Sequence, residues 1–402
     1  MPEPRARDPR TLLWAAVAAV GVGLLGFNTL PLLVGALIDG LGLDARQAGL
    51  LGSVEIGAMA VASLLLAPRV GVIPRRAVAI ASAAVVTGAH LLSAIPDEIA
   101  LLLSLRLLAG LGEGCIYAIA NAVIASSVDP DRLYARVTLV GALAVAALFL
   151  AIPYAIELWA HRGAFGSLAA VALFCVPLLL WLPRSRAGVV RIEHPDGVLL
   201  RGSSLAVLAS AFVLSVGEGA IWAFVERIGG HVGLSIDEVG VVLAITTVAG
   251  VSGAGLAAWL GTRFGRTIPL TFGMAAIGAA SMVLAYAGVP AAYVGAELAY
   301  NTAYLFVAPF LLGTAAAVDA QGRVAAATGG MVLVGGALGP AIGGALVAWG
   351  SYPPLGWLVL ACGALAISLI LPTAFALDRG EESAERVALR RQRVSWSPGI
   401  ER

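Results

Sequence analysis

Long apolar stretches separated by short polar connections fill almost the whole chain. Twelve of these stretches are long enough to cross about 30 Å of membrane hydrocarbon, which takes about 20 helical residues. The predicted spans are residues 11–38, 47–68, 78–95, 99–126, 137–158, 163–182, 205–224, 239–260, 268–287, 291–318, 324–349 and 355–377. This pattern predicts an all-α membrane protein of twelve transmembrane helices, with no soluble domain of useful size.

Composition supports a membrane protein. Hydrophobic residues make up 60% of the chain and charged residues 12%, and the mean hydropathy is +0.94. Soluble domains average about 45–50% apolar and about 25% charged residues. The three cysteines, Cys115, Cys175 and Cys362, all fall within predicted spans, so we expect them to pack against neighbouring helices rather than form disulfides or bind a metal.

Several function classes lack the residues they need. The phosphate-binding loop of ATP-driven proteins requires a lysine, and the chain contains none. No zinc-binding His-Glu-x-x-His helix, paired-histidine set or nucleophile with a nearby base lies in a span. The sequence therefore predicts neither an enzyme nor an ATP-driven pump, and we expect no cofactor and no nucleic-acid partner.

The arginines predict an orientation. All 25 basic residues are Arg, and with the N-terminus inside only Arg46, Arg162 and Arg227 fall on the outer side. By the positive-inside rule, both termini are predicted to be cytoplasmic, with the chain crossing the inner (plasma) membrane many times. The basic residues 386–393 are expected to be attracted to the anionic lipids of the bilayer.

The longest polar interruption divides the spans six and six. The predicted parts are an N-terminal six-helix bundle (residues 1–182), a cytoplasmic linker (183–204), a C-terminal six-helix bundle (205–377) and a cytoplasmic tail (378–402). The halves also repeat each other, because residues 42–49, before the second span, match residues 233–240, before the eighth. Repeated halves of this size build many transporters.

A loop motif follows both the second and the eighth span. Arg69-Val70-Gly71 in the first copy corresponds to Arg263-Phe264-Gly265-Arg266 in the second. With the repeated halves, this loop resembles the major facilitator superfamily over nearly the full chain, although both copies lack the acid that the family carries before the Arg. The resemblance implies two pseudo-symmetric bundles that rock around a central site, with Arg69, Gly71, Arg263, Gly265 and Arg266 as gating-loop residues.

The fourth span carries a second motif. Its segment from Arg106 to Glu113, Arg-Leu-Leu-Ala-Gly-Leu-Gly-Glu, is similar to the family's fourth-helix Arg-x-x-x-Gly-x-Gly pattern. Glu113 directly after the second glycine resembles the Spinster-type lysolipid and sphingolipid branch. The glycine-rich run 335–344 resembles the family's antiporter motif but lies in the eleventh span instead of the fifth, and we expect it to let helices pack closely.

Five ionisable residues lie well inside spans: Glu55, Arg106, Glu113, Glu218 and Glu297. A charge at the bilayer centre costs about 2.5 to 3.5 kcal/mol on insertion scales, so such residues usually face the bundle interior and mark a substrate or proton route. Arg106 and Glu113, two helical turns apart, project from nearly the same face. Burial and a nearby arginine act in opposite directions on the proton affinity of Glu113. We therefore expect Glu113, with Glu218 and Glu297, to couple transport to protons.

Polar and aromatic side chains of the first, fourth, seventh and tenth spans are the expected substrate contacts, because these helices line the cavity in the family that the chain resembles. They are Asn28, Arg106, Tyr117, Trp222, Tyr300, Asn301 and Tyr304. A purely structural ion pair is the alternative role for Arg106.

Other polar residues are expected at the margins of the spans. The third, sixth, ninth and twelfth spans are predicted to face lipid, because they contain no ionisable residue apart from His90 near one end of the third. Glu55 is placed near the outer end of its span, within reach of water, as an alternative to a place on the polar route. Glu226 and Arg227 are expected at a wetted helix end.

The function predicted is that of a proton-coupled secondary transporter, which moves a small organic solute by alternating access and works as a monomer. The solute is expected to be an organic anion or an aromatic or amphipathic compound. An exporter of lysolipids or hydrophobic compounds by proton antiport is one alternative. A transporter-like membrane sensor without turnover is the alternative from another class.

Overall fold

The computed structural model describes residues 9–96, 98–183, 198–319 and 321–395. Within these ranges the chain forms α-helices, two short 3-10 helices and one isolated bridge between Arg263 and Gly265, with no strand. The predicted all-α fold is confirmed.

The helices of the first half are α1 (Pro9–Gly23), α2 (Leu25–Leu41), α3 (Ala45–Leu66), α4 (Arg75–Ser93), α5 (Ile99–Ala125), α6 (Pro130–Trp159) and α7 (His161–Leu179). Those of the second half are α8 (Gly202–Trp222), α9 (Val225–His231), α10 (Ile236–Leu260), α11 (Thr267–Ala285), α12 (Pro290–Val318), α13 (Arg323–Val347) and α14 (Pro353–Ser395). The 3-10 helices are η1 (Ala67–Arg69) and η2 (Val198–Leu200).

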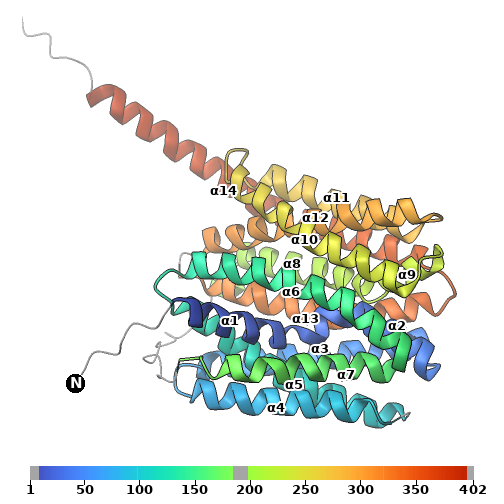
Figure 1. The fold of residues 1–402 in the computed structure, drawn as a ribbon. Helices are drawn as coiled ribbons and strands as arrows, with labels where there is room; N and C mark the ends of the chain where they lie inside the picture. The colour runs from blue at the N-terminus through green and yellow to red at the C-terminus, as the bar shows by residue number, and fades with distance from the viewer. Residues whose placement is uncertain (1–8, 97, 184–197, 320, 396–402) are drawn as a thin grey trace, which may run out of the picture.

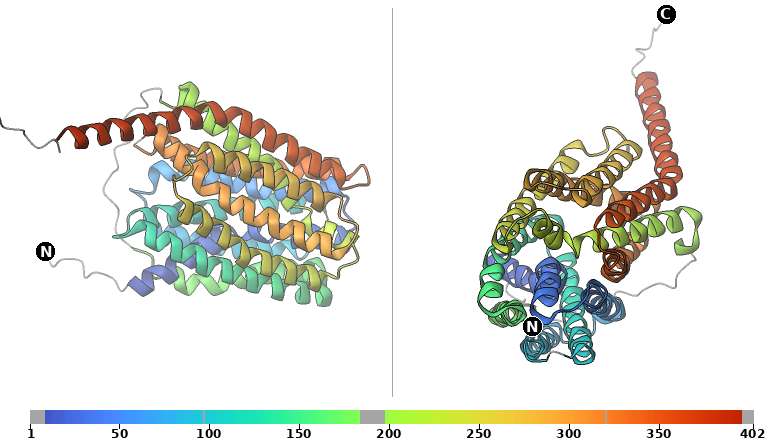
Figure 2. Two further views of the ribbon diagram at one scale, coloured as in Figure 1. Left: turned by 90° about the horizontal axis from the view of Figure 1, so that it is seen from above. Right: turned by 90° about the vertical axis from the view of Figure 1, so that its right-hand side faces the viewer.

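Consecutive spans run in alternating directions between the two ends of the bundle (Figures 1 and 2). We call the end where α1 begins the terminal end, and the other the opposite end. Among the described residues, eleven helices are long and apolar enough to span a membrane, and the bent pair α1 and α2 supplies a twelfth. The arrangement is consistent with two six-helix bundles, and the segment that joins them, 184–197, lies outside the described residues.

The first, seventh and twelfth spans differ from their predicted form. The first span is broken at Leu24, where α1 and α2 meet at 42°. Gly21, Gly23 and Gly26 surround this break, and glycine weakens a helix by about 1 kcal/mol relative to alanine. The seventh span, α8, ends at Trp222 and is followed by the separate short helix α9 beyond the predicted span. The last helix, α14, continues to Ser395 instead of ending near Leu377.

The repeated octets form the same structure in both halves. Asp44 caps α3 and Ser235 caps α10, each in a reciprocal capping box with the residue three positions on, Gln47 and Glu238. The glycine that begins each octet has a positive φ, 66° at Gly42 and 91° at the equivalent position 233. These caps satisfy backbone donors at the helix start. The repeated octets therefore correspond to the starts of α3 and α10.

The glycine-rich run of α13 packs this helix against both halves, as predicted. A Cβ added at Gly339 would lie 2.5 Å from the backbone nitrogen of Ala220 in α8. One added at Gly344 would collide with the carbonyl oxygen of Ala45 at the start of α3. Small residues allow such backbone contact between membrane helices, so α13 joins the two bundles.

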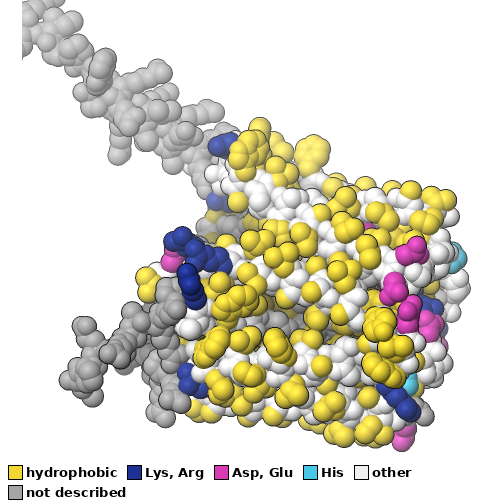
Figure 3. All heavy atoms as spheres, in the orientation of Figure 1, with side chains coloured by type: hydrophobic (Ala, Val, Ile, Leu, Met, Phe, Trp, Pro, Cys, Tyr) yellow, Lys and Arg dark blue, Asp and Glu magenta, His cyan; other side chains and the backbone are white. Residues whose placement is uncertain are grey.

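The flank of the molecule is apolar, whereas charges lie at its ends (Figure 3). Exposed side chains on the flank include Leu65, Phe174, Trp259 and Phe272. In the view of Figure 3, arginine side chains gather at the terminal end and acidic ones toward the opposite end. An apolar belt bounded by charge is the surface expected of a protein that sits in a bilayer.

Candidate functional site

A charged cluster lies inside the first bundle, closed to solvent. Arg106 of α5 donates from Nη1 to Glu55 Oε1 of α3 at 2.8 Å. Both side chains are almost fully buried, at 0% and 1% exposure. A buried guanidinium is tolerable only when it is paired and hydrogen-bonded, so this ion pair explains how the charge is accommodated.

Two more helices complete the surroundings of Arg106. Its Nη2 donates to Ser93 Oγ of α4 at 2.6 Å, and its Nη1 lies 3.2 Å from Nδ1 of His90, also on α4. The ring of Phe165 in α7 stacks on the guanidinium, 4.6 Å from Cζ to the ring centroid. The guanidinium is thus enclosed by α3, α4 and α7, away from the second bundle.

Glu113 lies on the other side of His90. Its Oε1 is 3.5 Å from His90 Nε2 and accepts a 3.1 Å hydrogen bond from the backbone N–H of Gly26 in α2. The imidazole therefore lies between Arg106 on Nδ1 and Glu113 on Nε2. Glu55 Oε2 and Glu113 Oε2 are both buried without a hydrogen-bond partner among the described residues.

The glycines of the fourth-helix motif bring these groups together. A Cβ at Gly110 would collide with the carbonyl oxygen of Glu55, and one at Gly112 would lie 2.7 Å from Val86 Cγ2 in α4. A Cβ at Gly26 would lie 2.8 Å from the Glu55 carboxylate and 3.0 Å from that of Glu113. Backbone contact between α5 and its neighbours therefore sets the spacing of the cluster.

The same atoms have the composition of a metal site. One ligand atom from each of Glu55, His90 and Glu113 lies within 4.8 Å of the others. However, the Arg106 guanidinium already contacts Glu55 and His90 inside this group. The guanidinium of Arg106 therefore already supplies positive charge at the place where a metal would bind. For this reason Glu55, His90 and Glu113 do not fit a metal ion while Arg106 is present.

One expectation at the margins of the spans is wrong. Glu55 is 1% exposed and paired, not within reach of water at the end of its helix. His90 lies in the last turn of α4, near the end of the span as expected, but it is fully buried and faces α5, so it is a site residue that the sequence analysis missed. One feature of the sequence could have indicated both positions. Well inside the spans of the first bundle lie two acids, Glu55 and Glu113, but a single base, Arg106, and this imbalance of charge predicts a further polar partner inside the bundle.

A second polar group lies in the C-terminal bundle. The Tyr304 hydroxyl of α12 is hydrogen-bonded to the Glu218 carboxylate of α8, which is 8% exposed. One turn earlier on α12, Tyr300 interacts electrostatically with both Glu218 and Glu297. Tyr300 Oη and Glu297 Oε1 are buried without a hydrogen-bond partner among the described residues. We call Glu218, Glu297, Tyr300 and Tyr304 the α8–α12 cluster.

The other predicted substrate contacts separate into two groups. Tyr117 of α5 interacts with Tyr304 across the boundary between the bundles, and Trp222 Nε1 donates to the carbonyl oxygen of Phe27 in α2 at 2.9 Å. Both side chains are partly exposed, as is Asn28. Asn301 instead points toward α10, where a Cβ at Gly250 would lie 3.0 Å from its Oδ1. Asn301 therefore contacts α10.

The predicted gating loops lie at the terminal end and are held by different partners. In the first copy, which includes Gly71, Arg69 donates to the carbonyl oxygen of Leu65. In the second copy, Gly265 has a φ of 65°, and the backbone N–H groups of Arg266 and Thr267 donate to Asp378 at 2.8 and 3.0 Å. Arg263 stacks on Trp259. Asp378 of α14 thus supplies a carboxylate to a loop whose sequence lacks the acid of the family motif.

Contacts between the bundles at the opposite end correct another expectation. Arg227 of α9 forms an ion pair with Asp39 of α2, with 2.5 Å between Nη1 and Oδ2. Glu226 is only 5% exposed, and its carboxylate fills the space where Gly35 lacks a side chain. Glu226 is therefore buried in the interface between the halves instead of being wetted, whereas Arg227, 26% exposed, still reaches solvent at the helix end as expected.

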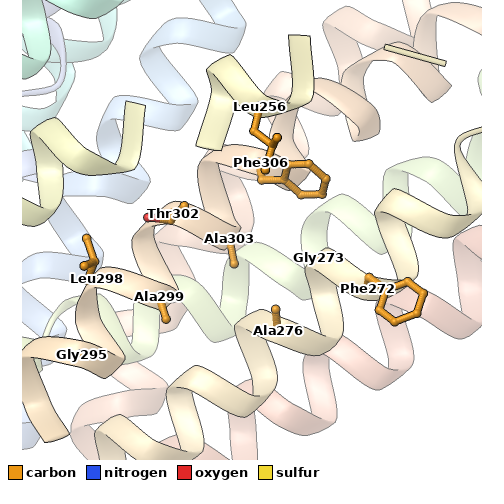
Figure 4. A pocket seen from close by; sticks show the side chains of 10 residues that line it. All are labelled: Leu256, Phe272, Gly273, Ala276, Gly295, Leu298, Ala299, Thr302, Ala303 and Phe306. Atoms are coloured by element: carbon orange, nitrogen blue, oxygen red, sulfur yellow. The ribbon is translucent and has the colours of Figure 1, made fainter. Parts of the chain in front are cut away.

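A groove of about 430 Å³ lies on the flank of the second bundle, between α10, α11 and α12 (Figure 4). Its lining is apolar apart from Thr302, and includes Leu256, Phe272, Leu298 and Phe306. It contains no ionisable side chain, so it is separate in chemistry from both charged clusters.

Comparisons with known proteins agree with this architecture. A family model described as Major Facilitator Superfamily matches residues 15–318 and, in a second match, residues 207–401. A solved structure of a variant of the nucleoside transporter NupG is similar, with a TM-score of 0.72 and 12% identity, covering 91% of this chain and 99% of that one. At this identity the likeness concerns the fold alone. No curated protein matches, and the Spinster-type resemblance stays a prediction.

Proposed function

Because the chain belongs to the Major Facilitator Superfamily and is a non-enzymatic secondary transporter of a small molecule, we propose that it couples movement of its solute to protons at Glu113 and the neighbouring buried groups. The solute is an organic compound, and the membrane is the inner membrane, with both termini cytoplasmic. Alternating access moves the central site between the two sides.

One observation carries the proton coupling: the cluster of the first bundle contains two carboxylates and an imidazole but a single permanent cation. With Arg106 paired to Glu55, the charge on Glu113 has no cation of its own, and the imidazole of His90 lies 3.5 Å from its Oε1. An unpaired buried carboxylate is costly, so Glu113 is stable there when it holds a proton or shares one with His90. Intramembrane acids and histidines in this arrangement form proton relays in transporters.

The charged cluster of the first bundle also contacts a helix that connects the two bundles. Glu113 is hydrogen-bonded to the backbone of Gly26, two residues from the break between α1 and α2. The same half-helix α2 contacts α9 of the other bundle through Asp39 and Arg227. A change in the protonation of Glu113 therefore acts on a helix that joins the two bundles.

The two bundles contact each other closely at the opposite end. There α2 meets α9 and α3 meets α13, and a Cβ at Gly240 of α10 would collide with the carbonyl oxygen of Phe149 in α6. Toward the terminal end α3 and α13 meet again, where a Cβ at Gly330 would lie 2.8 Å from Leu64 Cδ2. Alternating access requires the contacts at the two ends to separate in turn.

The test begins with ligand binding, because the substrate is unidentified. Thermal unfolding of the detergent-purified protein is measured against organic anions, aromatic metabolites, lysolipids and lipophilic cations, since a ligand at a hundredfold excess over its Kd stabilises by about 2.7 kcal/mol. The compound with the largest shift is then added to proteoliposomes that contain a pH-sensitive dye, and proton movement is followed.

We expect Glu113→Gln to abolish proton movement and gradient-driven accumulation while binding persists. Glu157→Gln is the matched control, since Glu157 is exposed at the end of α6. Unchanged proton-driven accumulation in Glu113→Gln would contradict the proposal. Binding without flux in the unsubstituted protein would instead indicate a sensor.

A further inference from the structure

The α8–α12 cluster holds two buried carboxyl groups, Glu218 and Glu297, and none of the ion pairs found among the described residues includes either of them. Each arginine between positions 198 and 380 lies at or beyond the end of a span: Arg201, Arg227, Arg263, Arg266, Arg323 and Arg379. Glu218 and Glu297, by contrast, lie in the interior of α8 and α12, and are at least nine-tenths buried. The two bundles therefore differ, because one of the two acids in the first, Glu55, is paired with Arg106.

Unused hydrogen-bonding capacity in this cluster points to a missing partner. Glu297 Oε1 and Tyr300 Oη, 1% and 4% exposed, have no hydrogen-bond partner among the described residues. Buried polar atoms are almost always satisfied in stable proteins, by protein, water or ligand. Since Tyr300 interacts with both Glu218 and Glu297, the unsatisfied atoms belong to one connected group.

Tyr304 lies against Glu218, and aromatic side chains of the first bundle lie beside Tyr304. Tyr304 is bonded to the Glu218 carboxylate and interacts with Tyr117 of α5 and Tyr134 of α6. Trp222, one turn from Glu218 on α8, is partly exposed and packs edge-on against Phe149, 6.1 Å between ring centroids. A carboxylate bordered by aromatic faces is the arrangement that binds an organic cation, through charge pairing and cation-π attraction.

Arg106 gives no comparable site for an anion. Its guanidinium is fully buried, bonded to Glu55 and Ser93, and covered by Phe165. A substrate anion would have to displace Glu55 and leave that carboxylate unpaired in the bundle, which is costly. The expectation that Arg106 binds an organic anion therefore finds no open face in this conformation.

We infer that the transported solute is an organic cation with an aromatic or apolar body, whose positive charge lies against Glu218 between Tyr117, Tyr304 and Trp222. This inference rests on the proposed transport function but not on its proton coupling. Binding of the cation supplies the counter-charge that the second bundle lacks, and Tyr300 with Glu297 adds hydrogen-bond partners for a substituent of the cation.

A pair of probes with equal shape and opposite charge tests the inference. Tetraphenylphosphonium and tetraphenylborate are titrated onto the full-length protein in detergent, without any gradient. We expect saturable binding of the phosphonium, weakened at least tenfold by Glu218→Gln and unchanged by the control Glu157→Gln. Equal or tighter binding of the borate, or unchanged phosphonium binding to a folded Glu218→Gln variant, would overturn the inference.

A measurement on the unsubstituted protein keeps the inference testable if Glu218→Gln does not fold. Dicyclohexylcarbodiimide labels buried carboxyl groups, and peptide mass spectrometry reports labelling at Glu218. We expect tetraphenylphosphonium to protect Glu218 from labelling and tetraphenylborate to leave it reactive; a lack of protection by the cation would overturn the inference. Because no gradient is present, these results stand apart from the proton-flux test on Glu113.

Discussion

Arg106 and Glu55 form an ion pair with 2.8 Å between Nη1 and Oε1, at 0% and 1% exposure, although 51 positions separate them in the chain. The pair links α5 to α3, while His90 and Ser93 link the same guanidinium to α4. One side chain therefore holds three helices of the first bundle together, and its loss has consequences for stability as well as for transport.

We predict that Arg106→Gln lowers the stability of the protein by about 3–5 kcal/mol, because it leaves Glu55 as an uncompensated buried charge. Adding Glu55→Gln to this variant is expected to restore much of the loss. Thermal unfolding in detergent measures both effects. The exposed Arg162→Gln serves as control and is expected to unfold like the unsubstituted protein. A double variant no more stable than Arg106→Gln alone would contradict this account of the pair.

Asp39→Asn is predicted to open the end of the bundle opposite the termini. It removes the ion pair with Arg227 that connects α2 to α9. Because Asp39 is 66% exposed, the pair is worth only about 0.2–1 kcal/mol, which corresponds to a rise of about 1.4- to 5-fold in the open population. The rate at which an impermeant maleimide labels a cysteine placed at Asn28, in a variant without native cysteines, measures this rise.

The control for this experiment is Asp237→Asn, an acid at the same end in the first turn of α10. Its labelling rate is expected to match that of the unsubstituted background. If Asp39→Asn labels no faster than Asp237→Asn, the ion pair does not hold that end closed.

Gly339→Ala is predicted to destabilise the joint between α13 and α8. The added Cβ would lie 2.5 Å from the backbone nitrogen of Ala220, a contact that backbone atoms cannot relieve by a rotamer change. Overpacking of this kind typically costs about 1–3 kcal/mol. Gly329→Ala in the same helix meets no atom within 4 Å and is the matched control. Thermal unfolding of the two variants should differ by this amount, and equal stability would show that α13 shifts to accept the methyl group.

The connection between α12 and α13 predicts a pH dependence. Hydrogen bonds from the Arg323 side chain lower the pKa of Asp319 to about 2. An aspartate in an unfolded chain has a pKa of about 3.9, so the stabilisation by Asp319 is complete above that value and is lost as the pH falls through about 2. We expect Asp319→Asn to unfold at a lower temperature than the unsubstituted protein near neutral pH, with the difference shrinking between about pH 4 and pH 2. A difference that does not change with pH would contradict the assignment.

The polar residues of the cluster show how far sequence analysis could go. The cost of charge in hydrocarbon identified Arg106 and Glu113 as interior groups, and the fourth-helix motif related them to a transporter family. The partners of Arg106 could not be predicted, because helical periodicity gives the face of a residue but not the helix that this face meets. His90 illustrates the limit, since its position near a helix end fits a lipid-facing residue equally well.

The sequence by itself determined the apolar spans, the six-and-six division and the equivalent caps at Asp44 and Ser235, because these depend on local hydrophobicity and on hydrogen bonds within a few residues. Tertiary structure alone decided that Glu55 pairs with Arg106, that Arg227 pairs with Asp39, and that Glu218 forms no ion pair with the part of the chain that the structure describes. These pairings depend on which helix backbones approach each other. Glycines without a side chain allow that approach, and its geometry is fixed only when all the helices are packed.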